Sequence, residues 1–526
     1  MVNAKFFRIP LILIACFALL NSLFAQKTGN LSSKNRIWDS SNFADTTLIF
    51  STLHPVVTKQ SLYLKSDKSR SWFLRKALHE NFIIVDTSDF QLCIDPLFNF
   101  SYTNETDYDQ SIYNNSRGVI VKGMLGEKIY FESSFTENQS FFASYITDFT
   151  KSNKIVPGLG FVKPFKDGGY DYAYATGIVS YSPSTHFNFQ FGHGKNFIGD
   201  GYRSLLLSDA AFFYPHLKIT TQFWKFQYTN MYATFLDLNQ AHTYEGGFQR
   251  KYGTFHFLDF AVTDWFSMGL FEAIMWQAAD SSGKRGYDIN YLNPIIFYRP
   301  VEFSLGSPDN AIMGATFKIQ PLKNYTLYGQ FVLDDLDIEE SRKATGFILN
   351  KYGYQLGMKT RDFLNIKNLN WLCEYNLVRP YVFAHKTPLQ NYSHYRQSLA
   401  HPYGANFYEL VGMISYTYKR FSIDVKLNMA NYGKDTTGSH WGKDIFISDF
   451  EAQRGYPSYG NEVGQGVNTD FLFFETTLHF IINPESNIVA FISYAKRKEE
   501  NNLNSTDHSF VTIGVKTNVF NFYNDF

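Results

Sequence analysis

The residues most able to do chemistry lie in or beside one glycine-rich stretch, residues 194–216. His193, Asp200 and Ser204 are the residue types of a nucleophilic triad. Their spacing fixes no geometry, and the chain contains no G-x-S-x-G elbow. We therefore expect a non-enzymatic protein, with a membrane-embedded hydrolase as a minor alternative.

Two other patterns resemble ligand-binding motifs without completing them. Gly194-Lys195 has the Gly-Lys pair of a phosphate loop, but Asn196 stands where that loop needs Ser or Thr. The acidic run at 334–340 lacks the Asp-x-Asp-x-Asn-Gly order of a calcium loop. We expect a solvated loop there, with a weak divalent-cation site as the alternative, and we predict no cofactor and no metal.

The elements that carry these residues show a period of two. Phe187, Phe189 and Phe191 alternate with Asn188 and Gln190, which places the rings and the amides on opposite faces of a strand. Charged residues opposite apolar faces in other segments imply a wet interior, because a dry one would have to desolvate them. This pattern is typical of an outer-membrane barrel.

Eighteen segments alternate in this way, and most have the length of a tilted spanning strand. They are 92–101, 117–125, 127–135, 172–182, 186–193, 217–223, 226–236, 254–262, 266–275, 312–319, 325–334, 352–361, 369–378, 408–418, 421–429, 472–482, 488–496 and 510–519.

The connections between these segments alternate in length. Every even-numbered connection is a short turn, such as 224–225 and 419–420, and every odd-numbered one is longer, such as 276–311 and 430–471. Outer-membrane barrels have short periplasmic turns and long external loops. The fold prediction is an all-β, antiparallel outer-membrane barrel of about 18 strands, located in the cell outer membrane and in contact with its lipid.

Composition agrees with that fold. The 526 residues include 48 Lys plus Arg and 48 Asp plus Glu, so the formal net charge is zero and no nucleic acid is expected as a partner. Aromatic residues make up 18%, which suits the aromatic girdles of a membrane barrel. Cys93 and Cys373 lie in predicted strands, and a disulfide between them is left open.

The N-terminus predicts export. Residues 1–25 have the basic start, apolar run and small-residue cleavage site of a signal peptide. Cys16 in Leu-Ile-Ala-Cys gives a lipoprotein signal as the alternative, although the apolar run continues past it. Residues 26–91 form a periplasmic helical segment, with a helix at 67–81, interpreted as a lid or plug; a partner-binding helix is the alternative. The barrel covers 92–526.

The C-terminus carries Phe520, Phe522 and a final Phe526. We interpret these residues as part of an apolar terminal strand, the signal that barrel-insertion machinery commonly recognises. The machinery is thus an expected partner during biogenesis.

The stretch 194–219 resembles the signature of the capsule-assembly outer-membrane proteins of the Wzi type. The matching residues are Phe197, Gly199, Gly201, Ser204, Leu205, Leu207, Ser208, Ala210, Ala211 and Pro215. Residues 291–314 and 401–409 resemble the Bacteroidota branch of that family, which includes gliding-motility RemB-like proteins. Ile198 and Asp200 depart from the family, which tends to have Trp and Pro beside the first glycine. The resemblance implies an eighteen-stranded barrel with a helical periplasmic element.

The three resembling segments lie in or beside odd-numbered connections, so we expect them to converge at the external mouth of the barrel. Arg203 and Arg299 are expected to fork onto nearby carboxylates, locking the loops; direct ligand contact is the alternative. The candidate residues are Lys195, Asp200, Tyr202, Arg203, Asp209, Asn293, Arg299, Glu302, Asp309, Asn310, His401, Asn406 and Glu409.

The function expected from the resemblance is attachment or assembly of surface polysaccharide, such as capsule, or gliding motility that depends on it. Loop 430–471 adds Trp441, Tyr456 and Tyr459, flat faces of the kind that hold sugars. A porin or uptake channel for small solutes is the alternative, because charged inward faces would equally permit it.

Overall fold

The protein is described from a computed structural model. The structure describes residues 27–29, 37–38, 49–58, 71–238, 247–280, 283–295, 309–450, 457–517, 520 and 522–526. Several predictions concern residues outside this part of the chain. They are the signal peptide, with its ordinary and lipoprotein alternatives, the start of the helix expected at 67–81, and the residues Arg299, Glu302 and Tyr456.

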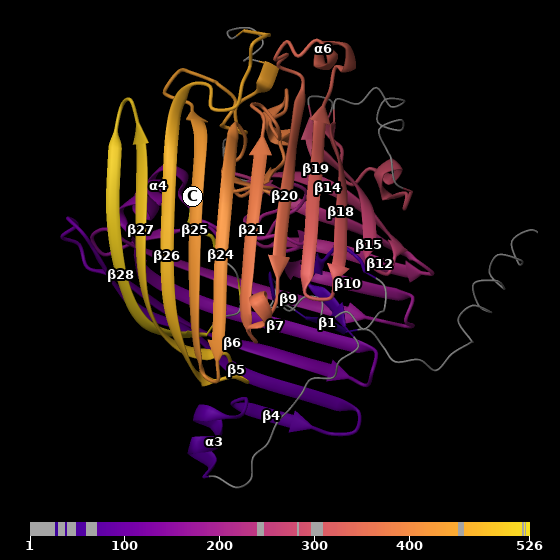
Figure 1. The fold of residues 1–526 in the computed structure, drawn as a ribbon. Coiled ribbons are helices and arrows are strands. Elements are labelled where there is room, and N and C mark those ends of the chain that lie inside the picture. Colours follow the sequence, from indigo (N-terminus) through magenta and orange to yellow (C-terminus); the bar gives the residue numbers. More distant parts are fainter. Residues whose placement is uncertain are drawn as a thin grey trace, which may run out of the picture.

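Eighteen long strands form a closed antiparallel barrel (Figure 1). They are β5 (Phe90–Glu105), β6 (Ile112–Leu125), β7 (Ile129–Phe141), β9 (Gly169–Tyr181), β10 (Phe187–Gly194), β12 (Tyr214–Phe223), β13 (Phe226–Asp237), β14 (Gln249–Thr263), β15 (Phe266–Gln277), β18 (Asn310–Leu322), β19 (Tyr325–Asp335), β20 (Lys351–Thr360), β21 (Leu369–Val378), β24 (Phe407–Tyr418), β25 (Phe421–Lys434), β26 (Val467–Asn483), β27 (Ile488–Asn501) and β28 (Ser505–Thr517). Pairing of β28 with β5 closes the ring.

Each of the eighteen predicted segments overlaps one of these strands, so the fold prediction is confirmed. Many strands are longer than predicted, because the pairing continues past the apolar belt into residues that no longer alternate. Phe187, Phe189 and Phe191 are exposed on the outside, whereas Asn188 and Gln190 are fully buried inside. A closed sheet with an apolar outer face is an outer-membrane barrel, because closure leaves no strand edge unpaired in lipid.

The alternation of connection lengths holds with two corrections. The odd connection 106–111, between β5 and β6, is shorter than the even connection 361–368, between β20 and β21. The even-numbered connections are turns such as 224–225 and 419–420, and the odd-numbered ones include the long stretches 195–213 and 379–406. The last odd connection, between β27 and β28, is only 502–504, because both strands extend beyond their apolar parts. The prediction that every odd connection is longer is wrong in both places.

The short elements lie at the two ends of the barrel and within it. The helices are α3 (Trp72–Leu78), α4 (Ser144–Asn153), α6 (Ile338–Arg342), η2 (Ile289–Leu292), η3 (Phe363–Asn365) and η4 (Pro388–Gln390). The short strands are β1 (Lys27–Gly29), β2 (Leu53–His54), β3 (Val56–Thr58), β4 (Ile83–Asp86), β8 (Lys163–Phe165), β11 (Phe197–Ile198), β16 (Ala279–Asp280), β17 (Gly283–Lys284), β22 (Ser393–His394) and β23 (Gln397–Ser398). Among the described residues no helix is long and apolar enough to span a membrane.

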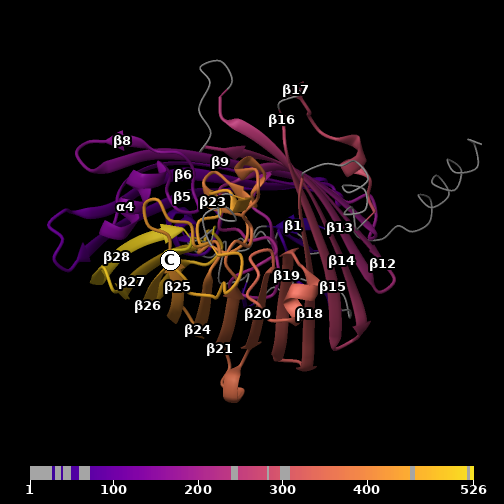
Figure 2. The ribbon, with the colours of Figure 1, turned by 90° about the horizontal axis from the view of Figure 1, so that it is seen from above.

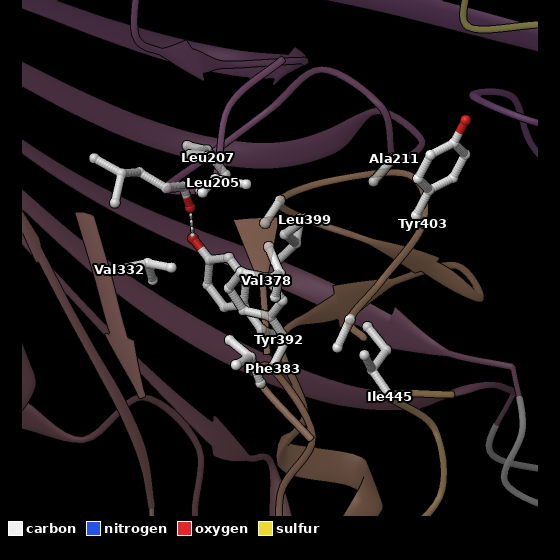
Figure 3. Close-up of a cluster of buried hydrophobic side chains, with 14 of the residues drawn as sticks. Leu205, Leu207, Ala211, Val332, Val378, Phe383, Tyr392, Leu399, Tyr403 and Ile445 are labelled. Atoms are coloured by element: carbon white, nitrogen blue, oxygen red, sulfur yellow. Dashed lines mark hydrogen bonds between the residues drawn. The ribbon is translucent and has the colours of Figure 1, made fainter. Parts of the chain in front are cut away.

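Two odd-numbered connections fold into the lumen, where Figure 2 shows the orange part of the chain inside the ring. We call residues 195–213 the first inner loop and residues 379–406 the second inner loop. Leu205, Leu206 and Leu207 of the first are fully buried. The hydroxyl of Tyr392 in the second donates to the carbonyl of Leu206 at 2.5 Å (Figure 3). The interior thus contains an apolar core that the two loops share.

The expectation that residues 26–91 precede the barrel as a periplasmic helical segment requires a correction. The helix α3 is present at the short-turn end. Leu53 and His54, however, form β2, which pairs with β11 of the first inner loop. The backbone N–H of Ser51 also contacts the buried carboxylate of Asp259 on the inner wall. This part of the chain therefore lies inside the barrel, where its backbone groups find partners.

The expectation of a terminal strand ending at Phe526 is also wrong. The last barrel strand ends at Thr517, and residues 522–526, the C-terminal tail, lie in the interior (Figure 2). Tyr523 and Asp525 are buried there. The Asn-Asp pair before Phe526 interrupts the alternation and has polar partners in the lumen, where Lys426 binds Asn524 and Arg203 binds Asp525. Cys93 and Cys373 are both free, so the disulfide between them, which the sequence left undecided, is not formed.

Candidate functional site

Arg203 of the first inner loop is the centre of a buried charge cluster. Its side chain is 0% exposed, and its Nη2 lies 2.9 Å from Glu409 Oε1 and 3.3 Å from Asp525 Oδ2. The guanidinium also lies over the rings of Tyr202 and Tyr523, at 4.7 and 4.8 Å. Arg203 therefore joins the first inner loop, the barrel wall and the C-terminal tail.

The backbone beside Arg203 is held by a wall carboxylate, Glu374 of β21. The N–H groups of Tyr202 and Arg203 donate to its two oxygens at 2.8 and 3.0 Å. Tyr328 donates its hydroxyl to the same carboxylate at 2.8 Å. A Cβ at Gly201 would lie 2.0 Å from Glu374 Oε2, so only glycine permits this close approach.

Glu409 of β24 connects the cluster to the second inner loop. Its Oε2 lies 2.7 Å from His401 Nε2, and it accepts hydrogen bonds from Asn376 at 3.0 Å and Asn428 at 2.8 Å. Because Arg203 and these donors surround the carboxylate, they offset the free-energy cost of removing its charge from water. The predicted residues Tyr202, Arg203, His401 and Glu409 therefore come together.

Asp200 has a different partner from the one expected. Its Oδ1 lies 2.8 Å from Lys318 Nζ and accepts from Thr52 Oγ1 at 2.7 Å. Lys359 Nζ donates to its backbone oxygen at 2.6 Å. Although burial raises the pKa of Asp200, the two lysines outweigh it and hold that pKa below its usual value. Arg203 and Asp200 thus have separate partners: the wall lysines Lys318 and Lys359 bind Asp200, whereas Arg203 binds Glu409 and Asp525.

Lys195 and Asp209 tie down the two ends of the first inner loop. Lys195 Nζ donates to the carbonyls of Gly158 at 2.7 Å and Asp209 at 2.9 Å. Burial lowers the pKa of Lys195 to about 8. The hydroxyl of Tyr523 donates to Asp209 Oδ1 at 2.6 Å, so the C-terminal tail reaches this end of the loop as well.

Asp309 and Asn310 belong to a second group. Arg285 makes a bidentate pair with Asp309, with both distances 2.6 Å, and Tyr291 donates to it at 2.8 Å. Asn310 donates to the carbonyl of Gln390 at 3.0 Å. The bidentate partner of Asp309 is thus Arg285, which was not among the candidate residues. Asn293 is exposed, while Arg299 and Glu302 lie outside the described part of the chain.

Asn406, at the end of the second inner loop, binds the loop between β25 and β26. Its Nδ2 donates to the carbonyls of Trp441 at 3.2 Å and Gln465 at 2.9 Å, and its Oδ1 accepts from the N–H of Gly464 at 2.7 Å. Its φ of 58° is the left-handed conformation that Asn tolerates better than most residues. Asn406 thus fixes the loop between β25 and β26 to the end of the second inner loop.

The expected convergence at the external mouth requires correction, because the Arg203 cluster is fully buried in the lumen. A cavity of about 340 Å³, which we call the outer pocket, lies on the loop side of this cluster. Its lining includes Phe149 of α4, Arg396, Tyr403, Lys434, Asp435, Lys443, Asp444, Tyr523 and Phe526. Burial lowers the pKa of Lys443 to about 8. The pocket thus combines aromatic faces with charges of both signs.

A larger cavity of about 890 Å³, the inner cavity, lies against β5–β7 and β24–β28. Polar wall residues line it, among them Ser116, Asn138, Asp424, Lys426, Glu475, His479 and Lys516. Pro157 and Tyr523 line both cavities, so the C-terminal tail stands between them. The wet interior expected from the sequence fits this half of the lumen.

The sequence reasoning missed Glu374, Lys318, Lys359, Arg285, Lys443 and Asp525. The first three lie in strands that were predicted, but an inward position alone does not show whether a loop or water surrounds the charge. Asp525 follows the end of the alternation, which marks the tail as something other than a strand. Among the described residues no group of three or more His, Cys, Asp or Glu could hold a metal ion. Asp334 and Asp335 belong to β19, and Asp334 is buried, so the expectation of a solvated loop is wrong at the start of the acidic run. Asp337 caps α6, where it accepts from the N–H of Glu340 at 3.0 Å.

No family model and no curated protein matches the chain. It is similar to the solved structure of Wzi, an outer-membrane protein involved in group 1 capsule assembly in Escherichia coli and a carbohydrate-binding barrel. That likeness has 12% identity, covers 80% of this chain and 84% of that one, and has a TM-score of 0.49.

It is also similar to the outer-membrane protein OprD of Pseudomonas aeruginosa, with 11% identity, 86% and 98% coverage and a TM-score of 0.41. OpdK of the same organism, solved with vanillate, has 8% identity, 80% and 97% coverage and a TM-score of 0.43. Because these scores are below 0.5, the barrel assignment rests on the strand pairing of this chain.

Proposed function

We propose that this barrel is a non-enzymatic protein that binds surface polysaccharide at its outer pocket and thereby attaches or organises it at the cell exterior. One observation carries the proposal: a pocket with aromatic faces and charged groups lies over the two inner loops, which pack into an apolar core within the lumen. Aromatic faces stack on the apolar faces of sugar rings, and charged side chains bind hydroxyl and carboxylate groups. The sequence resemblance to the capsule-assembly family supports the same class.

The polysaccharide serves encapsulation or a gliding motility that depends on surface glycan. Deletion of the gene separates these uses. Loss of the stained surface layer with normal movement would indicate encapsulation, whereas loss of movement would indicate the role in gliding motility. An intact layer and normal movement would overturn the proposal.

Lys443 provides the direct test of the pocket. Its Nζ lies 4.6 Å from the centre of the Tyr432 ring and donates to the carbonyl of Tyr403 at 2.9 Å. We expect Lys443→Met to weaken binding of purified barrel to the isolated surface polysaccharide about tenfold, because a charged hydrogen bond contributes roughly 1.5 kcal/mol. Lys343→Met is the matched control, since Lys343 is exposed directly after α6 and outside the pocket lining. Equal binding by both variants would remove Lys443 from the site.

A solute channel is the second candidate function, and the inner cavity favours it. A polar space of about 890 Å³ within the barrel is large enough for a small solute. Conductance in planar bilayers separates the two functions. Steady single-channel current through the unmodified protein would favour the channel, and a closed barrel that still binds polysaccharide would favour attachment.

A further inference from the structure

An apolar surface projects beyond the barrel at its short-turn end. It belongs to α3 and β4, which lie below the strands in Figure 1. Its six side chains are 38 to 70% exposed, and we call them the rim patch: Trp72, Phe73, Leu74, Phe82, Ile83 and Val85. A patch of this kind on an ordered element usually marks an interaction surface.

The patch is held on the barrel by polar contacts on the opposite side of the segment. Asn483 Nδ2 donates to the carbonyls of Lys76 at 2.9 Å and Glu80 at 2.8 Å. Arg420 donates to the carbonyl of Leu78 at 3.2 Å, and Asn81 donates to Asp95 at 2.6 Å. The segment therefore has a fixed polar face toward the barrel rim, and the apolar residues are its outward face.

The strand register makes this patch continuous with the lipid-facing surface. Ile83 pairs with Ile94 and Val85 with Leu92. On β5 these even-numbered residues share a face with Phe100 and Tyr102, which are exposed on the outside, while Cys93 and Asp95 face the interior and are buried. β28 pairs with β5 over residues 99–105, so Ile83 and Val85 extend the outer apolar face alongside the start of β5, beyond the end of β28.

The charges of the segment fit the same arrangement. Arg75 and Lys76 both pair with Glu80, at 3.4 and 3.1 Å, so the basic groups of α3 are turned toward its inner side and away from the patch. Trp72 packs edge-to-face on Phe82, with ring centres 6.5 Å apart. Tryptophan and phenylalanine next to apolar aliphatic residues are typical of the membrane–water interface.

We propose that the rim patch is inserted in the phospholipid leaflet at the short-turn end of the barrel, so that α3 and β4 form an interfacial anchor. The partner is thus the lipid itself. A protein partner or a second copy of this chain on the patch is the competing outcome.

Trp72 serves as the probe in the full-length barrel, reconstituted into vesicles of phosphatidylcholine brominated on the upper part of its acyl chains. The emission of Trp72 is obtained as the difference between the unmodified protein and Trp72→Phe. We expect this difference emission to lose most of its intensity in brominated vesicles compared with unbrominated ones, and to be protected from aqueous acrylamide. Trp224→Phe is the matched control, because Trp224 is exposed in the turn between β12 and β13 at the same end.

Two results would overturn the proposal. If acrylamide quenches the difference emission and brominated lipid does not, the patch faces water. If neither quencher acts, another protein surface covers it. The Trp72→Phe and Trp224→Phe variants must both keep heat-modifiable gel mobility, and their exposed positions make that the expected result. Polysaccharide binding at the outer pocket is independent of all three outcomes.

Discussion

The two halves of the lumen differ although their walls follow the same sequence pattern. Strands β14–β21 face the inner loops, and their inward polar groups contact chain at distances near 3 Å, as in the pair of Lys318 with Asp200. Strands β5–β7 and β26–β28 face the inner cavity, where similar groups line open space. The alternation of a strand thus determines which side chains point inward, and the loops determine whether those side chains are packed or solvated.

We expect the largest effect from replacing Arg203, which lies at the centre of the half of the lumen that the inner loops occupy. We call this half the packed half. Arg203→Met removes the arginine from the buried Glu409 and leaves Asp525 with Lys426 as its one cation, and removal of one partner from a buried ion pair costs about 3–5 kcal/mol. We expect a clear fall in the melting temperature in detergent. We also expect more conductance in planar bilayers, because the C-terminal tail is released from between the two cavities.

Arg342→Met is the control for this experiment, since Arg342 is exposed on α6. If both variants melt and conduct like the unmodified protein, the cluster does not lock the loops.

Substitution of one lysine in each half of the lumen compares the two halves directly. Lys251 Nζ on β14 is fully buried and donates to Asn391 Oδ1 at 2.6 Å and Ser393 Oγ at 3.1 Å. Lys251→Met should destabilise the barrel by about 1–3 kcal/mol, because it leaves buried acceptors without their donor. Lys516→Met on the wall of the inner cavity should change stability less. Urea unfolding in lipid vesicles measures both, and equal losses would contradict the distinction between the halves.

The smallest effect is expected for a carboxylate in the inner cavity. Asp424 lies 3.1 Å from His479, and both side chains are partly exposed. Asp424→Asn should change the free energy of unfolding by less than about 1 kcal/mol, because water screens the pair. A loss as large as that of Lys251→Met would show that the cavity wall is as tightly coupled as the packed half.

The strands were predictable because the alternation of apolar and polar residues within each strand reflects the lipid on one face and the lumen on the other. In Phe421–Lys434 the lipid-facing residues Phe421, Ile423, Leu427 and Met429 are exposed, as alternation requires. The partners of Arg203 were not predictable, because Glu409 and Asp525 lie 206 and 322 positions away. No local pattern encodes which of several inward carboxylates a loop will reach.

The contacts of the chain before the barrel were not predictable either. Ser51 and Thr52 reach Asp259 and Asp200 in the lumen, yet their own neighbourhood in the sequence looks like an ordinary linker. The candidate residues gathered from the loops were drawn from glycine-rich and polar composition. That composition identified the inner loops without indicating how deep in the barrel they lie.

The contact of Arg203 with Asp525 also has a consequence for the order of folding. The two residues lie on opposite sides of thirteen barrel strands in the sequence, β12–β28. Contacts between such distant residues require closure of a very long loop, so they are favoured only after the strands between them have paired. We expect barrel closure to precede sealing of the lumen. During refolding, strand circular dichroism should then develop before the amide of Arg203 is protected from hydrogen exchange, and simultaneous appearance would contradict this order.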